Sequence, residues 1–125
     1  MKSRKSIAEM TDDEIRLRFI EIGIAQFDVA CEPEDADQFN RFYAENEKLE
    51  EKLRSRPGDR RPVLFDPMKH PNMQLRFNAA TALFALYPKE AREALLEIHE
   101  KADGPIATGA IAHLDWIDQG KFTPT

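Results

Sequence analysis

The sequence predicts an all-α fold of about six helices, arranged as a short right-handed α-α superhelix, that is, a solenoid. Three observations predict it. Apolar residues recur at spacings of three and four over most of the chain, and no segment shows the period-two pattern of a strand. Capping residues, glycines and prolines separate the apolar segments at helix-length intervals. A two-helix segment also occurs twice in the second half, at an offset of 31 residues from Leu64 to Leu95.

Length and composition limit the class of protein. The chain has 125 residues, which suits a single domain over residues 1–125, and its 42% hydrophobic and 33% charged residues are typical of a globular protein. No apolar run is long enough to span a bilayer, and no signal peptide follows the basic start. Cys31 is the only cysteine, so an internal disulfide is excluded. We therefore expect a cytoplasmic protein that does not bind a membrane.

The first helix is expected to follow a flexible N-terminal arm of residues 1–10. Thr11 and Glu14 have the spacing of a capping box, in which each side chain bonds the backbone N–H of the other residue. Pro33 disfavours helix at the preceding residue, so the helix should stop near Cys31. Its apolar residues form two neighbouring stripes, and such a wide face needs cover on more than one side. The first stripe is Ile15, Phe19 and Ile22, and the second is Ile20, Ile24 and Phe27.

A second helix is expected from about Asp35 to Arg54, and it completes an N-terminal helical pair over residues 11–57. Its apolar residues follow a helical spacing and its other positions are mostly charged, so one face should stay in water. A turn then leads to a short third helix, roughly Arg60 to Lys69, in which Pro67 should cause a kink.

Three further helices are expected in the second half. Asn72 is a natural N-cap for the first of them, and Gly120 supplies the C-cap of the last. The expected bounds are residues 72 to 87, 89 to 101 and 106 to 119, and residues 121–125 form a C-terminal tail.

Residues 58–120 form two predicted helix pairs with matching core positions. The segment from Pro71 to Leu83 resembles the second helix of a HEAT repeat: a proline-containing capped turn, an apolar residue followed by Arg, and paired alanines. The resemblance implies a HEAT/armadillo-like stack in which the first two helices act as an N-terminal cap. Each unit of such a stack buries its apolar face against the next. An offset of 31 residues places Leu64 on Leu95, Ala79 on Ala110 and Leu83 on Leu114.

Five short motifs together resemble a family of short bacterial proteins catalogued as a domain of unknown function with a HEAT/armadillo-like helical fold. The resemblance covers nearly the whole chain from about Met10, and it brings no catalytic residues. HEAT-like modules of this size often occur as binding proteins, including immunity proteins beside bacterial toxins, which is an argument by analogy. The motifs occupy residues 39–43, 58–61, 70–76, 86–88 and 118–124.

Charge is unevenly distributed along this chain, whose net charge is −5. Residues 32–51 hold eight acids and two bases, whereas residues 52–61 hold five bases and one acid. The basic turn from Arg54 to Arg61 opens a predicted helix, so phosphate, nucleic acid or an acidic protein could bind there. The alternative is that these arginines pair internally with the acids of residues 32–51. The negative net charge and the lack of aromatic residues in the turn make nucleic acid the weaker choice.

The sequence shows no catalytic or metal-binding pattern, because its three histidines are dispersed and Cys31 has no partner base. We expect no cofactor and a non-enzymatic module that binds another protein, possessing a regulatory or immunity-type role. An enzyme with an unrecognised site between the helices is the other alternative. Phe122 should dock near Trp116, either as a structural clasp or as part of a partner-binding patch. The candidate partner-binding residues are Arg56, Arg60, Arg61, Arg76, Trp116 and Phe122.

Overall fold

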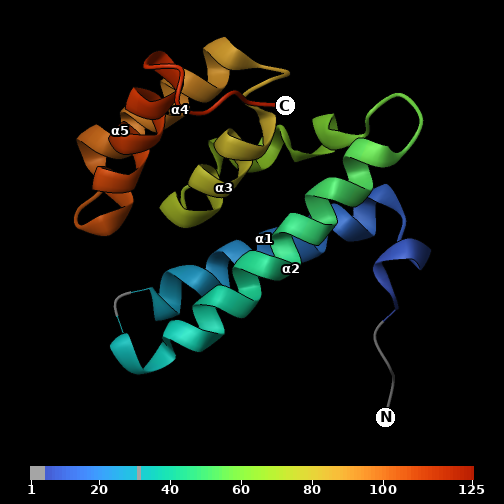
Figure 1. The fold of residues 1–125 in the computed structure, drawn as a ribbon. Helices are drawn as coiled ribbons and strands as arrows, with labels where there is room; N and C mark the ends of the chain where they lie inside the picture. Colours follow the sequence, from blue (N-terminus) through green and yellow to red (C-terminus); the bar gives the residue numbers. More distant parts are fainter. Residues whose placement is uncertain (1–4, 31) are drawn as a thin grey trace.

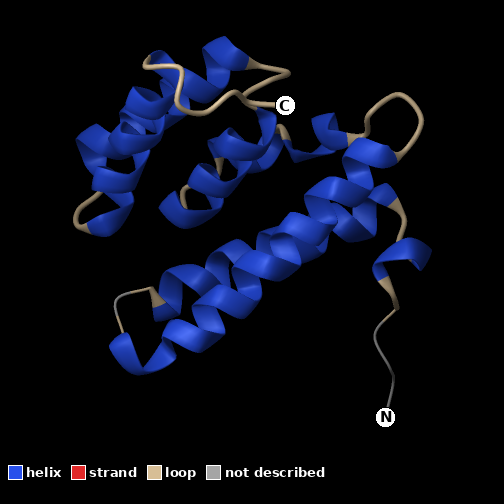
Figure 2. Ribbon diagram, viewed as in Figure 1, coloured by secondary structure: helices blue, strands red, loops and turns tan. Residues whose placement is uncertain are grey.

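The computed structural model describes residues 5–30 and 32–125, and this part of the chain contains helices and no strand (Figure 2). The all-α prediction is therefore confirmed. The α-helices are α1 (Asp12–Val29), α2 (Ala36–Ser55), α3 (Met73–Leu83), α4 (Pro88–Lys101) and α5 (Pro105–Asp118). The short 3-10 helices are η1 (Ile7–Glu9), η2 (Pro33–Asp35), η3 (Arg61–Leu64) and η4 (Asp66–Lys69).

The α-helices lie in two groups (Figure 1). α1 and α2 run antiparallel as a hairpin, and α3, α4 and α5 follow one another on the other side of the molecule. α3 is the central element, because it packs against α1 of the hairpin and against α4, which in turn packs against α5. The buried apolar side chains form one cluster that extends from Met10 to Leu114.

The start of α1 follows the sequence prediction. Thr11 Oγ1 accepts a hydrogen bond from Glu14 N at 3.1 Å, and Glu14 Oε1 accepts one from Thr11 N at 3.0 Å, so the capping box is formed. α1 ends at Val29, and the predicted helix end at Cys31 lies outside the described residues.

Gly23 sets the distance between α1 and α3. A Cβ atom on Gly23 would lie 2.8 Å from both Cα and Cβ of Leu75. A close-packed interior has no room for such an approach, so glycine is the residue that lets the two helices pack at this point.

The predicted third α-helix is wrong in its type. Residues 61–69 instead form η3 and η4, which meet at Phe65. Pro62 and Pro67 explain the difference, because each lacks the backbone N–H that an α-helix needs. The chain closes the tighter bonds of a 3-10 helix, with Phe65 N donating to Pro62 O at 3.0 Å and His70 N to Pro67 O at 3.1 Å.

α3 begins as predicted and ends earlier. Asn72 Oδ1 accepts a hydrogen bond from Leu75 N at 3.1 Å, which is the predicted N-cap contact. The helix ends at Leu83 rather than at Tyr87, whose N–H still bonds Leu83 O at 2.8 Å in a following turn. Pro88 is the reason, because it disfavours helical geometry at the preceding residue.

The predicted repeat matches in part, and η3 and η4 replace the first helix of its first unit. Three of the matched pairs lie in the core, because Leu64 and Leu95, Ala79 and Ala110, and Leu83 and Leu114 are each at most 2% exposed. Other matched positions differ: Leu86 and Leu96 are 37% and 40% exposed, and Asn72 caps α3 whereas the N-cap of α5 is Gly104.

Both ends of the described chain contact the fold. The structure corrects the flexible arm predicted for residues 1–10 over its described part, because Ile7 and Met10 place apolar side chains against the core. At the other end Gly120 closes α5 with a φ of 72°, as predicted for a C-cap glycine. The C-terminal tail then runs back toward α3 (red in Figure 1).

Candidate binding surfaces

One of the two apolar stripes predicted on α1 stays open to solvent. Ile15, Phe19 and Ile22 are buried as expected. Ile24 and Phe27 are 38% and 48% exposed, and Leu17, at 49%, lies on the same side of the helix. Spacings of three, four and three residues join these three and the partly buried Ile20 into one row. We call this row, Leu17, Ile20, Ile24 and Phe27, the α1 stripe.

Acidic residues border the α1 stripe. Glu21 and Asp28 lie seven residues apart and flank it along one side, and Asp13 lies one turn before it. Arg18 makes its closest contacts with α2, where its guanidinium bonds both carboxylate oxygens of Glu45 at 2.6 and 2.8 Å, and its Nη1 also lies 3.8 Å from Glu21 Oε2. The surface around the stripe is therefore apolar in the middle and negative at its edge.

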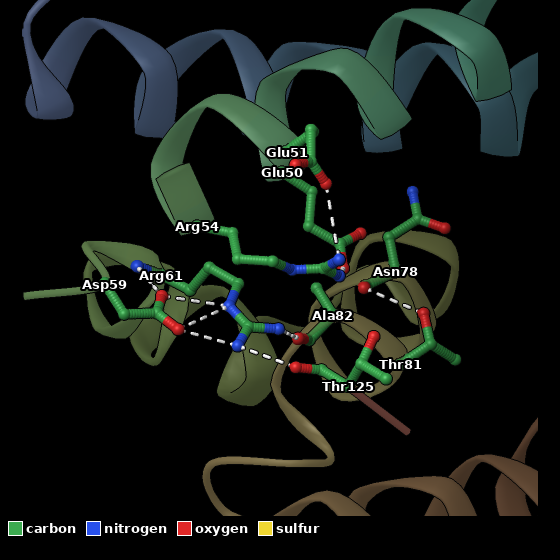
Figure 3. A network of polar contacts seen from close by, with 9 residues as sticks. All are labelled: Glu50, Glu51, Arg54, Asp59, Arg61, Asn78, Thr81, Ala82 and Thr125. Atoms are coloured by element: carbon green, nitrogen blue, oxygen red, sulfur yellow. Dashed lines mark hydrogen bonds and ion pairs between the residues drawn. The ribbon is translucent and has the colours of Figure 1, made fainter. Parts of the chain in front are cut away.

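The basic turn from Arg54 to Arg61 holds parts of the fold together (Figure 3). Arg61 is 3% exposed, and its guanidinium donates to both carboxylate oxygens of Asp59 at 2.7–3.2 Å. It also donates to Ala82 O of α3 at 3.3 Å and to Thr125 O of the tail at 3.1 Å. Asp59 also accepts a hydrogen bond from Arg61 N at 3.2 Å, at the first residue of η3. Arg61 thus joins the turn, α3 and the tail.

Arg56 and Arg60 converge on Asp12 at the start of α1. Arg60 Nε donates to Asp12 Oδ2 at 2.7 Å, and Arg56 Nη1 donates to Asp12 Oδ1 at 2.6 Å. Hydrogen bonds from Arg60 and then from Arg56 hold the pKa of Asp12 below its usual value. Arg56 also bonds Met10 O at 2.6 Å, so the turn fastens the N-terminal segment to the end of α2.

Arg54 pairs with acids of its own helix, at 3.3 Å from both Glu50 Oε1 and Glu51 Oε2 (Figure 3). Burial raises the pKa of Glu50, and the charge of Arg54 opposes that shift. The predicted internal pairing with residues 32–51 is therefore right for Arg54. It is wrong for Arg56, Arg60 and Arg61. Their ion-pair partners are Asp12 and Asp59, which lie outside residues 32–51.

Arg76 also has partners within the chain. Its Nε donates to His70 O at 3.0 Å, and its Nη1 lies 2.9 Å from Glu97 Oε1 of α4. The side chain is 12% exposed, compared with 19% for Arg56 and 53% for Arg60. Arg60 is the most exposed of the four arginines predicted to contact a partner.

Trp116 and Phe122 are both exposed, at 57% and 44%. Phe122 N donates to Trp116 O at 3.3 Å, but its ring packs on His113, at 5.3 Å between ring centroids. The His113 ring in turn lies 6.3 Å from that of Phe77 on α3. Burial lowers the pKa of His113, so the ring is neutral at pH 7. The tail therefore clasps α5 through His113, one turn before Trp116.

A pocket of about 680 Å³ lies where the linked ends of α1 and α2 face α3 and the start of α5. We call it the end pocket. Most of its wall is apolar, and Asn40, Gln74 and Glu32 are the polar side chains among the described residues that line it. The apolar wall consists of Val29, Ala30, Ala36, Phe39, Phe77, Pro105, Ile106 and Gly109.

Buried amides fix the orientation of Gln74. Its Nε2 donates to Asn78 Oδ1 at 2.9 Å, and Asn78 Nδ2 donates to Gln26 Oε1 at 2.7 Å. Gln26 and Gln74 are 1% and 6% exposed. No described residue donates to Gln74 Oε1, and Gln74 is the buried one of the three polar residues in the described lining of the end pocket.

The described residues show no arrangement typical of a metal centre: nowhere in 5–30 and 32–125 do three or more His, Cys, Asp or Glu side chains gather closely enough to hold an ion. The same residues contain no helix long and apolar enough to cross a membrane. His99 bonds Ala107 O at 3.2 Å, and His113 contacts rings of α3 and the tail, so the two have different surroundings.

Sequence reasoning missed Leu17 and the end pocket. Leu17 precedes Ile20 by three residues, so the helical period held the signal. The pocket had no such signal, because its wall comes from four separate helices whose packing the sequence does not state.

Comparison with known proteins gives the family of this chain. A family model described as a domain of unknown function (DUF2019) matches residues 12–118. The chain therefore belongs to this family. It is also similar to the crystal structure of the protein RPA1889 from Rhodopseudomonas palustris CGA009, with 30% sequence identity and a TM-score of 0.90 over 98% of this chain and 100% of that chain. Among curated proteins, none matches it.

Proposed function

We propose that this member of the DUF2019 family is a non-enzymatic module that binds another protein through the α1 stripe. The observation that carries the proposal is the exposure of Leu17, Ile24 and Phe27 on a helix whose opposite side is fully buried. The apolar face of α1 is wide enough to need packing partners on two sides, and the described part of the chain buries one of these sides. A row of large apolar side chains on a protein surface is typical of an interaction site.

The acidic border defines the chemistry of the partner. A partner segment that fits the α1 stripe has apolar side chains at its centre and lysine or arginine at its edge, facing Glu21 and Asp28. The net charge of −5 favours encounter with such a basic partner at long range.

The proposal includes the architecture named from the sequence. η3, η4 and α3 form one HEAT-like unit, α4 and α5 form the next in a right-handed stack, and the α1–α2 hairpin caps the first. The common burial of the matched core positions supports this arrangement. A small acidic binding module of this kind suits a regulatory or immunity-type role, by analogy alone.

The alternatives named from the sequence have less support. A phosphate or nucleic acid at Arg54–Arg61 would have to displace carboxylates from Arg54, Arg56 and Arg61, each of which is at most 35% exposed. An enzyme would need converging ionisable groups between the helices. Glu32 is the one ionisable side chain among the described residues that line the end pocket, and two acids of a second pocket beside α2, Glu50 and Glu51, pair with Arg54.

Site-directed photocrosslinking tests the proposal. A photoreactive amino acid is placed at Ile24, and at the exposed Glu100 of α4 as a matched control, in the protein expressed in its native cells. We expect the Ile24 probe to give one protein adduct, attached through a segment rich in lysine or arginine, which the Glu100 probe does not give. Asp28→Lys should weaken the same adduct, because it reverses the charge at the edge of the stripe.

Three results would overturn the proposal: no adduct at Ile24, the same adducts at both positions, or an adduct with nucleic acid. Adducts between two copies of the chain would make the stripe a self-association surface instead, which size-exclusion chromatography with light scattering checks directly.

A further inference from the structure

We propose that the end pocket receives a tryptophan side chain from a basic segment of the protein partner. This inference rests on the proposed function in one respect, namely that the partner is a protein. It adds a second site, because the end pocket and the α1 stripe are lined by different residues.

The size and wall of the pocket favour an aromatic anchor. Phe39, Phe77 and Ile106 give a wide apolar lining around about 680 Å³, which lies in the range of pockets that bury a compact organic group. An aromatic side chain of a partner, with an aliphatic neighbour from the same turn, fits this volume and removes more apolar surface from water than an aliphatic side chain alone.

The open acceptor selects tryptophan among the aromatic residues. Gln74 is 6% exposed, its Nε2 is engaged by Asn78, and its Oε1 has no donor among the described residues. The indole of tryptophan is an apolar ring with a single N–H donor and no acceptor, which suits the acceptor of Gln74, the one polar lining residue that is buried, whereas Asn40 and Glu32 are exposed. Phenylalanine would leave Gln74 Oε1 without a partner inside the occupied pocket, at a cost in affinity.

The charge around the pocket points to a peptide with lysine or arginine rather than to a neutral or anionic small molecule. Glu32 lines the pocket, and Asp28, Glu34, Asp37 and Asp103 are exposed residues within two positions of lining residues in the sequence. These carboxylates come from the end of α1, from η2 and the start of α2, and from the segment before α5. An extended peptide with several lysine or arginine side chains can pair with more of these carboxylates than a small ligand can.

The test uses a short synthetic peptide in which lysine and arginine flank one central tryptophan, labelled with fluorescein and titrated with the full chain by anisotropy. We expect saturable binding to the wild type and a loss of about tenfold or more with Gly109→Leu, which fills the pocket. A Cβ atom at Gly109 would lie 3.8 Å from the Phe77 ring, an ordinary contact, so the variant should fold. Thr108→Leu, at the neighbouring exposed position, is the matched control and should bind as the wild type does.

Two further peptides separate the anchor from general charge attraction. A peptide with 1-methyltryptophan, which cannot donate from the indole, should bind the wild type about tenfold more weakly. Gln74→Leu should bind the two peptides equally, because it removes the acceptor; circular dichroism confirms that this variant is folded. A peptide with glutamate in place of lysine and arginine should not bind.

Equal binding by wild type and Gly109→Leu, no effect of indole methylation, or no binding of the basic peptide would overturn the inference. A photocrosslinked partner at Ile24 without any of these pocket effects would leave the proposed function standing and remove the end pocket from it. Peptide binding at the pocket without an Ile24 adduct would keep the end pocket as a binding site and would contradict binding of the partner through the α1 stripe.

Discussion

The two ends of the α1–α2 hairpin use their charged residues differently. At the clamped end, where α1 begins and α2 finishes, Arg56 and Arg60 bond Asp12, and Arg61 joins Asp59, α3 and the tail. At the open end, where α1 finishes and α2 begins, exposed acids surround the end pocket and lie beside the α1 stripe. The basic end is therefore tied into the fold, and the acidic end offers its carboxylates to solvent.

This difference shows that a run of charge in a sequence does not identify a binding site by itself. The basic turn holds four arginines within eight residues, yet Arg61 is 3% exposed and holds parts of the fold together. A better indicator of a binding site is a group that has no partner inside the described molecule, such as the exposed ring of Phe27 or the acceptor Oε1 of Gln74. We expect the clamped end to contribute to the stability of the fold and the open end to contribute little.

A large effect on stability is expected at Gly23, where the hairpin meets α3. Gly23→Ala places a Cβ atom 2.8 Å from backbone and side-chain atoms of Leu75, so α1 and α3 must move apart. We expect the free energy of unfolding, measured by urea denaturation, to fall by about 2–3 kcal/mol. Gly109→Ala is the control, because its Cβ atom meets the Phe77 ring at 3.8 Å and alanine favours helix, so it should be neutral or stabilising by up to about 1 kcal/mol. Similar losses from both variants would contradict the close approach of α1 to α3.

At the clamped end, Arg61→Met keeps the apolar stem of the side chain and removes its bonds to Asp59, Ala82 and Thr125. Because these groups lose a buried charged donor, the free energy of unfolding should fall by about 2–3 kcal/mol. Arg41→Met, at an exposed position of α2, should change it by less than about 0.5 kcal/mol. If the Arg61 variant unfolds at the urea concentration of the wild type, the turn does not clamp the fold.

The helices were largely predictable from the sequence because their signals are local. The Thr11–Glu14 capping box, the Asn72 cap and the Gly120 C-cap all form as their spacing predicts. The failures arose where two constraints competed. Pro62 and Pro67 turned the third helix into η3 and η4, and Pro88 ended α3 at Leu83.

The candidate surfaces were less predictable because they depend on contacts between distant residues. Nothing local says that Arg56 and Arg60 meet Asp12, more than 40 positions earlier, rather than nearby acids. The helical period did reveal two apolar stripes on α1, but which of them stays exposed is decided by the packing of α3. The end pocket is assembled entirely by tertiary structure, and so no sequence pattern indicated it.

A smaller, pH-dependent effect is expected from Asp12→Asn. The pKa of Asp12 is lowered in the folded protein, so its ion pairs stabilise the fold above the unfolded-state pKa near 4, and that contribution disappears as the pH falls through the lower folded value. At pH 7 the variant should lose about 0.5–1 kcal/mol of unfolding free energy, and the gap to the wild type should close at lower pH. Asp13→Asn, at the neighbouring exposed acid, should show a much smaller change. A gap that stays constant with pH would mean that the charge of Asp12 does not stabilise the fold.

The smallest effect on stability is expected in the α1 stripe, and it gives the sharpest contrast within one helix. Ile22 and Ile24 are two positions apart and are 0% and 38% exposed. Ile22→Ala leaves a cavity in the core and should lower the free energy of unfolding by about 2–4 kcal/mol. Ile24→Ala removes a side chain that already contacts water, so the loss should stay below about 1 kcal/mol, while the adduct formed by a photocrosslinker placed at Phe27 should weaken. Equal destabilisation by the two variants would mean that Ile24 belongs to the core. The α1 stripe would then not be an exposed surface that can bind a partner.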